Sequence, residues 1–474
     1  MTTECNQRRF QFHDLGAREV IAEFQGGDIT SDAGGLLLRE VEQATGILRR
    51  FAGGFRDHRD PELIEHSVLE LVSQRVYGLA LGYEDLVDHD DLRHDPLLAV
   101  LVGKSDPTGR QRARKRDQGK ALAGKSTLNR LELTPAGADA ESRYKKIVAS
   151  CGQIERLFVD VFLQSRFRAP KRIVLDLDAT DDPLHGHQLG RFFHGYYDNY
   201  CYLPLYIFCG EHLLCAKLRP SNIDASAGSV EELRRIVAQI RQRWPKVKIL
   251  IRADSGFCRE ALLAWCEQNR VDYVLGLAKN DRLHAEIAPE LIEAREDFEA
   301  TGEPTRVFRD FTYQTLESWS RARRVIGKAE YLPQGENPRF IVTSLSSDDF
   351  RGQRLYEDVY CARGDMENRI KEQQLFLFAD RTSCETMRAN QLRLYFSSVA
   401  YLLLVALRQN GLRGTELESA QCDTIRLKLL KIGAQVQLTV RKVWVALSES
   451  YPYRRVFAQI CDNLRHWRSR PLRC

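Results

Sequence analysis

The sequence predicts a mixed α/β protein in which a mostly helical N-terminal part precedes a core built on a β-sheet. Up to about residue 165 the apolar residues recur at helical spacing, for example after Asp60, an expected N-cap, and Pro61 at the first helical position. From Arg172 onward, strand-like runs and amphipathic helices follow the order β-β-β-α-β-α-β. We expect the first strands to pair as antiparallel hairpins and the later ones to pair in parallel.

Composition excludes several classes of protein. The 474 residues are 43% hydrophobic and 28% charged, which is typical of globular proteins and predicts more than one domain or a core with insertions. No run of 18 apolar residues and no N-terminal apolar signal occurs, so we expect no membrane association and a cytoplasmic location. The twelve cysteines form no Cys-x-x-Cys pair, which favours reduced thiols over a disulfide framework or a zinc ribbon.

A basic stretch spans residues 104–130. It holds nine Lys or Arg against two Asp, although the net charge of the whole chain is only +5. Such a run gains affinity for DNA by releasing counterions, and the alternative is a solvated loop without a partner. The candidate DNA-binding residues in it are Arg112, Arg114, Lys115 and Arg116.

The changes of pattern predict five consecutive segments. They are a helical DNA-binding N-terminal domain (1–165), the first half of the core (166–281), a β-rich insertion (282–350), the second half of the core (351–415) and a helical basic C-terminal region (416–474).

The stretch "RIVLDLDATDDPLHGHQ" (172–188) reads as a buried strand that carries two acids, Asp176 and Asp178. Strand side chains alternate, so both carboxylates point to the same face. Carboxylates are seldom buried unless they are paired or bind a metal. The histidines His185, His187 and His194 invite a zinc interpretation, but a glycine-rich turn explains them better.

Two further acidic positions stand out. Asp254 follows the strand in "KILIRADSGF" (248–257), where α/β sheets collect ligands, although it could simply cap the next turn. In the later helix, Tyr360, Arg363, Glu367 and Lys371 fall within an arc of about 80° at 100° per residue. The alternative for this stripe is a solvated face with ordinary i,i+4 pairs.

Three carboxylates drawn from a first strand, a later strand end and a late helix can meet to hold divalent metal ions. Mg²⁺ prefers hard oxygen ligands, and two such ions about 4 Å apart can activate an attacking oxygen and stabilise a leaving one.

The ordered set of motifs resembles the DDE transposases of bacterial insertion sequences, which have a ribonuclease-H-like mixed sheet core. The matching stretches are "DLDAT" (176–180), "RADSGF" (252–257) and "YCARGDMENRIKE" (360–372). With the β-rich insertion before the last of them, the chain is most similar to the branch with a Tyr-Arg-Glu-Lys signature and, within it, to the insertion-sequence 1380 group.

The resemblance implies that Asp178, Asp254 and Glu367 form the catalytic, metal-binding triad, with two Mg²⁺ or Mn²⁺ ions. Asp178 is favoured over Asp176 because a small residue and Thr follow it and because it lies nearer the strand's carboxyl end. Asp176 is expected to support the site as a neighbour.

The resemblance also implies DNA-contacting residues. Tyr360 and Arg363 would contact phosphates near the element end, and Lys371 would do so one turn earlier than the usual signature lysine, whose place Gln374 takes. Trp319, in the β-rich insertion, would hold a base flipped out of the duplex, or else belongs to the insertion's own small core.

The function implied is that of a transposase acting on double-stranded DNA, at the element ends and at the target, as a homodimer associated with the nucleoid. It would bind the terminal inverted repeats, cleave strands by two-metal hydrolysis and join the 3′-hydroxyl ends to target DNA. Two alternatives are a catalytically inactive DNA-binding protein of transposase origin and a nuclease of the same core that cuts without joining.

Overall fold

The computed structural model describes residues 9–468 and divides into two compact units. One unit contains the described residues up to 49, residues 59–131 and those from 406 onward; the other contains 50–58 and 132–405. Residues 1–8 and 469–474, the ends of the first and last predicted segments, lie outside the description.

The unit formed by both ends of the chain is mainly helical. Its helical elements are α1 (Gly35–Thr45), η1 (Pro61–Leu63), α3 (Val68–Leu81), α4 (His89–Leu92), α5 (Pro96–Val102), η2 (Lys115–Asp117), α15 (Cys422–Ile425), η7 (Arg426–Leu430) and α16 (Arg454–Arg468). The C-terminal segment belongs here because Lys431 Nζ lies 2.6 Å from Asp32 Oδ1 and Arg426 Nε donates to Ala80 O at 3.0 Å. Three of the four boundaries between the units fall within helices: α2 (Ile47–Ala52), α6 (Lys125–Leu133) and α14 (Met387–Asn410).

Strands also occur in the terminal regions, where the sequence pattern predicted helices. β1 (Phe10–Leu15) pairs with β2 (Arg18–Ala22), and β3 (Ile29–Thr30), β18 (Ala434–Leu438) and β19 (Val443–Leu447) form a second small sheet. Alternation such as "AQVQL" is too short to stand out in a long sequence, and its pairing with β3 joins residues more than 400 positions apart.

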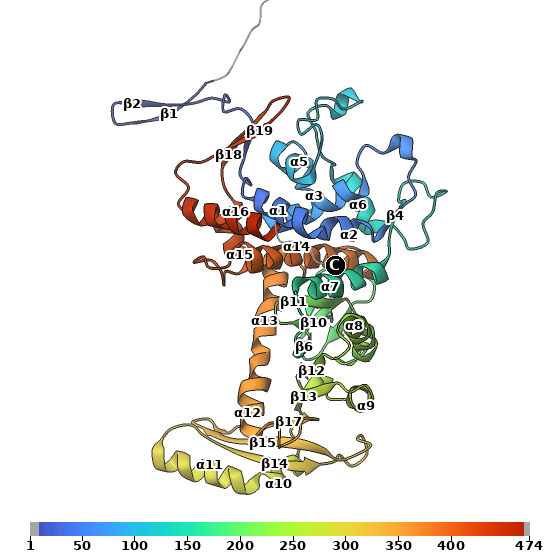
Figure 1. Cartoon of the computed structure of the whole chain (residues 1–474), viewed down its shortest axis with the longest axis vertical. Helices are drawn as coiled ribbons and strands as arrows, with labels where there is room; N and C mark the ends of the chain where they lie inside the picture. The colour runs from blue at the N-terminus through green and yellow to red at the C-terminus, as the bar shows by residue number, and fades with distance from the viewer. Residues whose placement is uncertain (1–8, 469–474) are drawn as a thin grey trace, which may run out of the picture. The chain divides into compact units, whose positions relative to one another are not determined.

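The second unit is built on a nine-stranded mixed sheet, so the predicted mixed α/β fold is confirmed (Figure 1). The strand order is β11-β10-β6-β12-β13-β17-β15-β14, with β16 paired to β15. The strands are β6 (Arg172–Ala179), β10 (Leu205–Cys209), β11 (His212–Lys217), β12 (Lys248–Ala253), β13 (Asp272–Leu277), β14 (Thr305–Tyr313), β15 (Arg323–Leu332), β16 (Gly335–Glu336) and β17 (Arg339–Thr343). β12 is parallel to β6 and β13, whereas β10 is antiparallel to β6. This is the hairpin set followed by alternating α/β that the sequence predicted.

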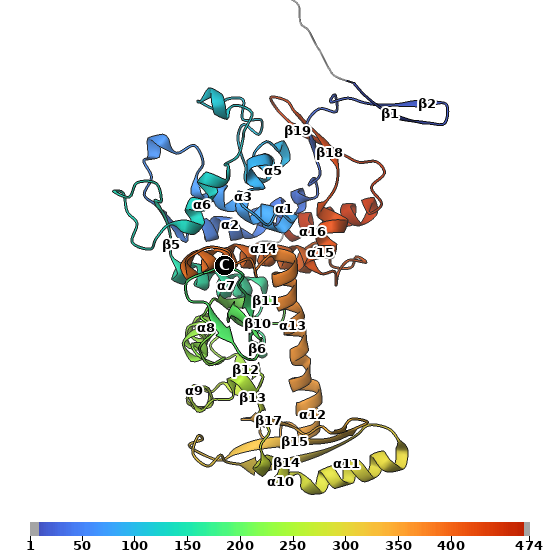
Figure 2. The same ribbon diagram turned by 180° about the vertical axis from the view of Figure 1, so that it is seen from behind.

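The sheet separates two apolar clusters. Ile173, Leu175 and Leu177 of β6 pack into the larger cluster, which α7 (Cys151–Ser165), α8 (Ser229–Arg243) and α9 (Glu260–Gln268) help to form. Val174, on the opposite parity, packs against a smaller cluster that includes Leu355 and Tyr356 of the late helical segment. Figures 1 and 2 show α8 and α9 on one side of the sheet and α13 on the other. Alternation therefore directs Asp176 and Asp178 toward the late helices.

The late helical segment runs from residue 352 to residue 376 with changing pitch. It consists of α12 (Gly352–Arg354), η4 (Leu355–Tyr360), η5 (Cys361–Arg363), α13 (Gly364–Lys371) and η6 (Glu372–Phe376). η4 and η6 are π-helical, and η5 is a 3₁₀ turn. Single π turns inside helices recur at functional sites, and here one of them ends at Tyr360.

The predicted β-rich insertion begins with helices. α10 (Asp281–Glu286) and α11 (Ala288–Thr301) precede β14, and the four strands that follow extend the core sheet through the pairing of β17 with β13. The first stretch is helical because Asn280 caps α10 and a proline stands in the first turn of α11. The insertion thus shares its sheet with the core.

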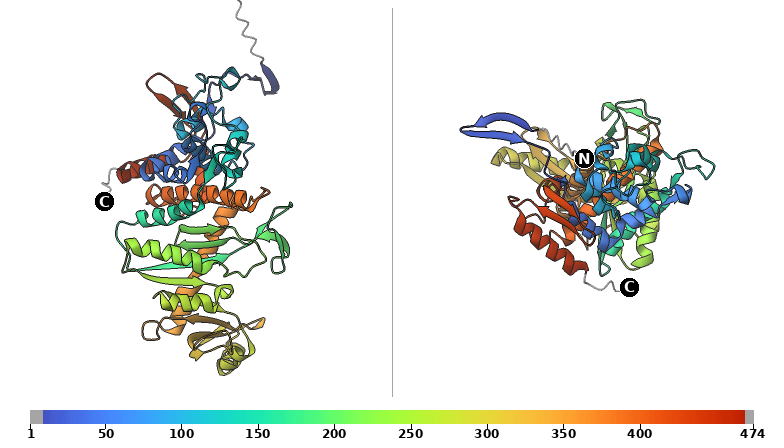
Figure 3. Two further views of the ribbon diagram at one scale, coloured as in Figure 1. Left: turned by 90° about the vertical axis from the view of Figure 1, so that its right-hand side faces the viewer. Right: turned by 90° about the horizontal axis from the view of Figure 1, so that it is seen from above.

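The smaller elements of this unit are two short sheets and a turn. β4 (Phe55–Asp57) pairs with β5 (Ile147–Ala149); β7 (Asp182–Pro183), β8 (Phe192–His194) and β9 (Asn199–Tyr202) form the other sheet; and η3 (Ser255–Phe257) follows β12. The green segment that follows β6 projects beside the large sheet (Figure 3, left).

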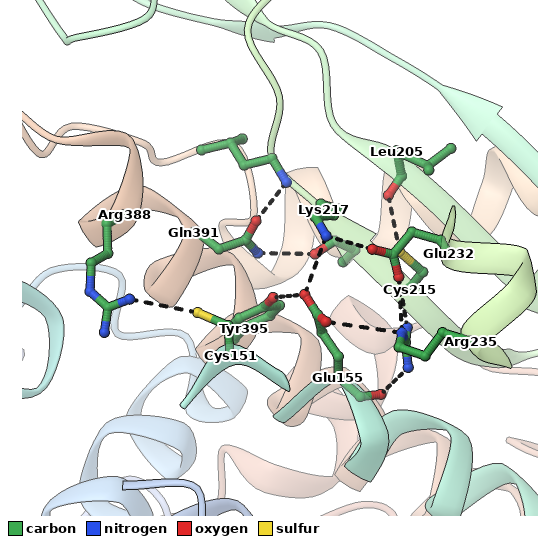
Figure 4. A network of polar contacts seen from close by, with 12 residues as sticks. Cys151, Glu155, Leu205, Cys215, Lys217, Glu232, Arg235, Arg388, Gln391 and Tyr395 are labelled. Atoms are coloured by element: carbon green, nitrogen blue, oxygen red, sulfur yellow. Dashed lines mark hydrogen bonds and ion pairs between the residues drawn. The ribbon is translucent and has the colours of Figure 1, made fainter. Parts of the chain in front are cut away.

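A polar network joins α14 to the free edge of the large sheet (Figure 4). Lys217 Nζ lies 2.5 Å from Glu232 Oε1 and 3.7 Å from Glu155 Oε1, and the Tyr395 hydroxyl donates to Glu155 at 2.8 Å. Gln391 bonds with its amide to both the N–H of Leu218 and the carbonyl of Ala216. α14 is apolar and long enough to span a membrane, but 94% of its most apolar window is buried in the protein, as in a core helix.

Candidate active site

Asp176 lies within a buried ion pair. It is only 4% exposed, and its two carboxylate oxygens accept from Arg252 Nε at 2.5 Å and Arg252 Nη2 at 2.9 Å. Arg252 is the direct neighbour of Asp176 in the parallel register of β12 and β6. Its remaining guanidinium nitrogen, Nη1, donates to the carbonyl of Val359. The sequence pattern did not single out Arg252. The feature that could have identified it is that a basic residue stands in an apolar strand, two positions before the candidate acid Asp254.

Asp178 lies two residues further along the same face. The side chain is 15% exposed, and Arg363 Nη1 lies 3.4 Å from its Oδ2. Burial raises the pKa of Asp178 to about 6; Arg363 opposes this rise, and the negative charges of Asp254 and Glu367 add to it. The carboxyl therefore feels both other candidate acids, which places the three in one electrostatic environment.

Asp254 follows the last residue of β12. The parallel register of β12 and β6 ends with the pair of Arg252 and Asp176, and Asp254 and Asp178 each follow two positions later in their own chain segment. Asp254 Oδ1 accepts from the N–H of Gly256 at 2.9 Å and caps η3. The capping role weighed as an alternative is therefore present, and it uses one oxygen of a carboxylate that has two.

Glu367 comes from α13, and Arg363 connects it to β6. The side chain is 47% exposed, and Arg363 Nη2 lies 3.0 Å from Glu367 Oε1. One guanidinium thus contacts both Asp178 and Glu367. Arg363 and Glu367 form the i,i+4 pair that the alternative expected, and Arg363 in addition reaches the sheet at Asp178.

Tyr360 belongs to the same site. Its hydroxyl packs against the backbone at Gly276, where an added Cβ would lie 2.6 Å from that oxygen and 2.8 Å from the N–H nitrogen of Ser255. Burial raises the pKa of Tyr360, so its hydroxyl remains a proton donor. Lys371 is exposed one turn beyond Glu367, and Gln374 donates to the carbonyl of Asp181 at 3.0 Å.

Metal fit depends on donor chemistry and on spacing. Within residues 9–468, no group of three or more His, Cys, Asp or Glu side chains is arranged to hold a metal ion. The donors themselves suit Mg²⁺ or Mn²⁺, since all three acids supply carboxylate oxygens; burial raises the pKa of Asp178, and the negative charges of Asp254 and Glu367 add to the rise. Arg363 provides the positive charge between two of them.

Trp319 lies apart from these residues and is 5% exposed. Its ring packs against Tyr313 at 6.0 Å and beneath Arg323 at 5.3 Å, within the larger apolar cluster. Arg323 is also committed, with Glu260 at 2.7 Å and Glu267 at 2.8 Å. These contacts favour the alternative that Trp319 is a core residue.

The basic stretch belongs to the other unit, and its residues divide into two kinds. Arg112 holds the loop together, because it donates to Glu65 at 2.6 Å and to the carbonyl of Lys120 at 2.7 Å. Arg114, Lys115 and Arg116, on or beside η2, are exposed.

The family of the chain follows from a match over most of its length. The family model described as transposase DDE domain group 1 matches residues 12–469. The chain belongs to this family. No curated protein matches it significantly.

Family membership makes the chain a DDE transposase, and such enzymes act on DNA. Members of this family generally use divalent metal ions.

Proposed function

We propose that this chain is an active transposase that binds the terminal inverted repeats of its insertion sequence, cleaves the DNA and joins the 3′-hydroxyl ends to target DNA. The observation that carries the proposal is that Arg363 contacts both Asp178 and Glu367, while the charge of Asp254 acts on Asp178 and on Arg363, on the face of the sheet that the late helices cover. A ribonuclease-H-like core is part of it, supported by the order β11-β10-β6-β12-β13 with its antiparallel and parallel halves.

Asp178, Asp254 and Glu367 would hold two Mg²⁺ or Mn²⁺ ions. When bound, such ions activate the attacking oxygen and stabilise the leaving oxygen of an in-line displacement at phosphorus. The chain's own part is positioning: β6 and β12 fix two carboxylates on a rigid sheet, and α13 brings the third. With metal held by these carboxylates, Arg363 would be available to contact a phosphate.

Tyr360 would donate its hydroxyl to a DNA phosphate beside Asp254, and exposed Lys371 would add a more distant phosphate contact. With these roles the chain would belong to the Tyr-Arg-Glu-Lys branch and the insertion-sequence 1380 group, with Gln374 as the departure from the usual signature. The exposed Arg114, Lys115 and Arg116 support non-specific DNA contact by the predicted N-terminal DNA-binding domain. A homodimer on DNA and a nucleoid-associated cytoplasmic location complete the proposal.

Replacement of Asp254 by alanine tests the triad. A labelled duplex carrying the element's terminal repeat is incubated with Mg²⁺ or Mn²⁺, and strand cleavage is followed on a denaturing gel. Asp254→Ala should abolish cleavage and leave end binding largely intact, whereas Asp348→Ala, at an exposed acid outside the site, should cleave normally. Full cleavage by the Asp254→Ala chain would contradict the assignment.

The two alternatives give different results in the same assay. A catalytically inactive DNA-binding protein would bind the duplex without metal-dependent nicking. A nuclease of the same core would nick it but fail to join the cut end to a target plasmid in a strand-transfer reaction.

A further inference from the structure

A group of exposed aromatic side chains lies immediately after the catalytic strand. The segment "LGRFFHGYYDNY" (189–200), here called the aromatic hairpin, contains β8, its turn and the start of β9. Its exposed apolar residues are Leu189 (58%), Phe192 (41%), Phe193 (53%), Tyr196 (84%) and Tyr200 (48%). So many large apolar groups within one short segment mark an interaction surface.

The aromatic hairpin is anchored beside the candidate active site. The Tyr197 hydroxyl donates to the carbonyl of Ala179, the residue after Asp178, at 3.2 Å. The charges of Asp178 and Asp254 contribute to raising the pKa of Tyr197, after burial and Asp181. Asn199 adds a bond of 3.0 Å to Asp181 Oδ2. The inner side of the hairpin is therefore fixed to the end of β6.

The outer side presents aromatic faces and a cation. Phe193 and Tyr200 are direct neighbours across β8 and β9, with ring centroids 5.5 Å apart at 73°. The Arg191 guanidinium stacks over the Tyr200 ring at 4.8 Å and is held by the carbonyl of Gly186 and by His187 Nδ1. Because these rings are exposed and already in fixed positions, little ordering is needed before they stack on a ligand.

We propose that the aromatic hairpin binds unpaired bases of the DNA strand next to the cleavage site. Exposed aromatic rings beside an arginine match the chemistry of single-stranded DNA, whose bases stack on aromatic faces while a cation attracts the backbone. The inference rests on the proposed function, because a DNA strand comes to this surface only if the adjacent carboxylates bind DNA for cleavage.

The proposal places base stacking in a different part of the chain from Trp319. Trp319 is 5% exposed, whereas Tyr196, at the tip of the hairpin, is 84% exposed. A base can reach the Tyr196 ring without disrupting the packing of the core.

Binding of a frayed DNA end tests the proposal without catalysis. The probes are a duplex with a short 3′ single-stranded overhang containing 2-aminopurine and the same sequence as a blunt duplex, both in metal-free buffer with the Asp254→Ala chain. The hairpin should quench 2-aminopurine and bind the overhang more tightly than the blunt end. Phe193→Ala with Tyr200→Ala should weaken overhang binding about tenfold or more and leave blunt-duplex binding unchanged.

Matched variants separate stacking from general damage. Tyr200→Phe keeps the ring and should retain the overhang preference. Phe167→Ala removes another exposed ring of the same unit, 80% exposed and outside the hairpin, and should change neither affinity. Circular dichroism melting of each variant checks that the fold is intact.

Three outcomes would overturn the proposal: an unchanged overhang preference in the double variant, an equal loss on both probes, or lost self-association with unchanged DNA binding, which would make the surface a protein interface. Failure of the proposed function appears separately, as metal-dependent cleavage by the Asp254→Ala chain or its absence in the unsubstituted chain, and does not alter the overhang preference.

Discussion

Two acidic positions on β6, Asp176 and Asp178, have their negative charge balanced in different ways. At the first, Asp176 faces Arg252, and both side chains are buried, at 4% and 8% exposure. At the second, Asp178 and Asp254 bring like charges to the strand ends, and the compensating charge comes from Arg363 on the late helical segment.

The difference separates a structural ion pair from a site where three carboxylates have one arginine to balance them. Arg252 satisfies Asp176 with two hydrogen bonds and reaches the carbonyl of Val359, next to Tyr360, so the first position fixes the late helix against the sheet. Burial raises the pKa of both carboxyls, and at the second position it raises the pKa of Asp178 to about 6, a state that an added cation would relieve. The pair of Asp176 and Arg252 keeps the strands and the late helix in place, so that the charged groups around Asp178 can exchange arginine for another cation.

Breaking the first position should have the largest effect on stability. Arg252→Ala leaves the Asp176 carboxylate buried without its partner, which costs about 3–5 kcal/mol for a buried pair. We expect a marked fall in the denaturant midpoint of the transition in which the sheet unfolds, followed by circular dichroism. Arg259→Ala, which removes a largely exposed partner of Asp224, should shift the midpoint little.

A double replacement sharpens this result. Asp176→Leu with Arg252→Met should recover most of the stability, because an apolar pair of similar volume needs no counter-charge. The bond to Val359 stays lost, so DNA cleavage should remain slow in a stable protein. Full recovery of cleavage would show that the contact with Val359 does not position the late helix.

Neutralising Asp178 should raise the stability of the folded chain, whereas Arg252→Ala lowers it. The pKa of Asp178 is about 6 in the folded chain against an ordinary 3.8, which corresponds to about 3 kcal/mol. Because the folded pKa is the higher one, this stability is present below about pH 4 and is lost as the pH rises through about 6. Asp178→Asn should therefore match the unsubstituted chain near pH 3.5 and exceed its midpoint above pH 6, in buffer with EDTA.

The same measurement on Asp348→Asn provides the control, since that side chain is exposed and outside the site. A midpoint difference for Asp178→Asn that does not change with pH would contradict the assignment of the penalty to this carboxyl.

The local periodicity of the sequence predicted much of this comparison. Alternation placed Asp176 and Asp178 on one face, and the apolar run before Asp254 placed that acid at a strand end. Neither pattern reveals that Arg252 faces Asp176, because the pairing depends on the register between strands 76 residues apart. The preference for Asp178 over Asp176 rested on the resemblance and on its place nearer the carboxyl end of the strand, and the ion pair of Asp176 with Arg252 supplies a further physical reason for it.

Elements that depend on distant partners escaped the sequence patterns. The strand β18 is recognisable only once β3 and β19 lie beside it, and the helices α10 and α11 open a segment whose later alternation dominates its pattern. A uniform turn of 100° per residue also missed the π turns of η4 and η6, although it grouped Arg363 with Glu367 correctly. Burial of Trp319 depends on packing that no local pattern encodes.

Addition of metal should stabilise the folded chain through the carboxylates of Asp178 and Asp254, and this effect should not depend on the pair of Asp176 and Arg252. Binding to the folded chain alone stabilises it by about 2.7 kcal/mol at a hundredfold excess over Kd. Mg²⁺ or Mn²⁺ should raise the midpoint of the unsubstituted chain at pH 8, and EDTA should reverse the rise. Asp178→Asn and Asp254→Ala should lose most of the response, while the Asp176→Leu, Arg252→Met pair should keep it; a full response in Asp178→Asn would remove that carboxylate from the metal site.

The smallest stability effect, and the most specific test of the second position, belongs to Arg363. Its guanidinium contacts Asp178 at 3.4 Å and the half-exposed Glu367 at 3.0 Å, so Arg363→Gln should lower stability by only about 1 kcal/mol in metal-free buffer. The guanidinium would compete with metal for the same oxygens, and the variant should therefore bind Mg²⁺ more tightly in a titration of the midpoint. Cleavage should still fall, since the proposed phosphate contact is lost. Arg369→Gln, on the same helix but paired with Glu211 and Glu372, should leave Mg²⁺ affinity unchanged. Weaker Mg²⁺ binding in Arg363→Gln alone would mean that the arginine holds the carboxylates in place for the metal instead of standing where the metal binds.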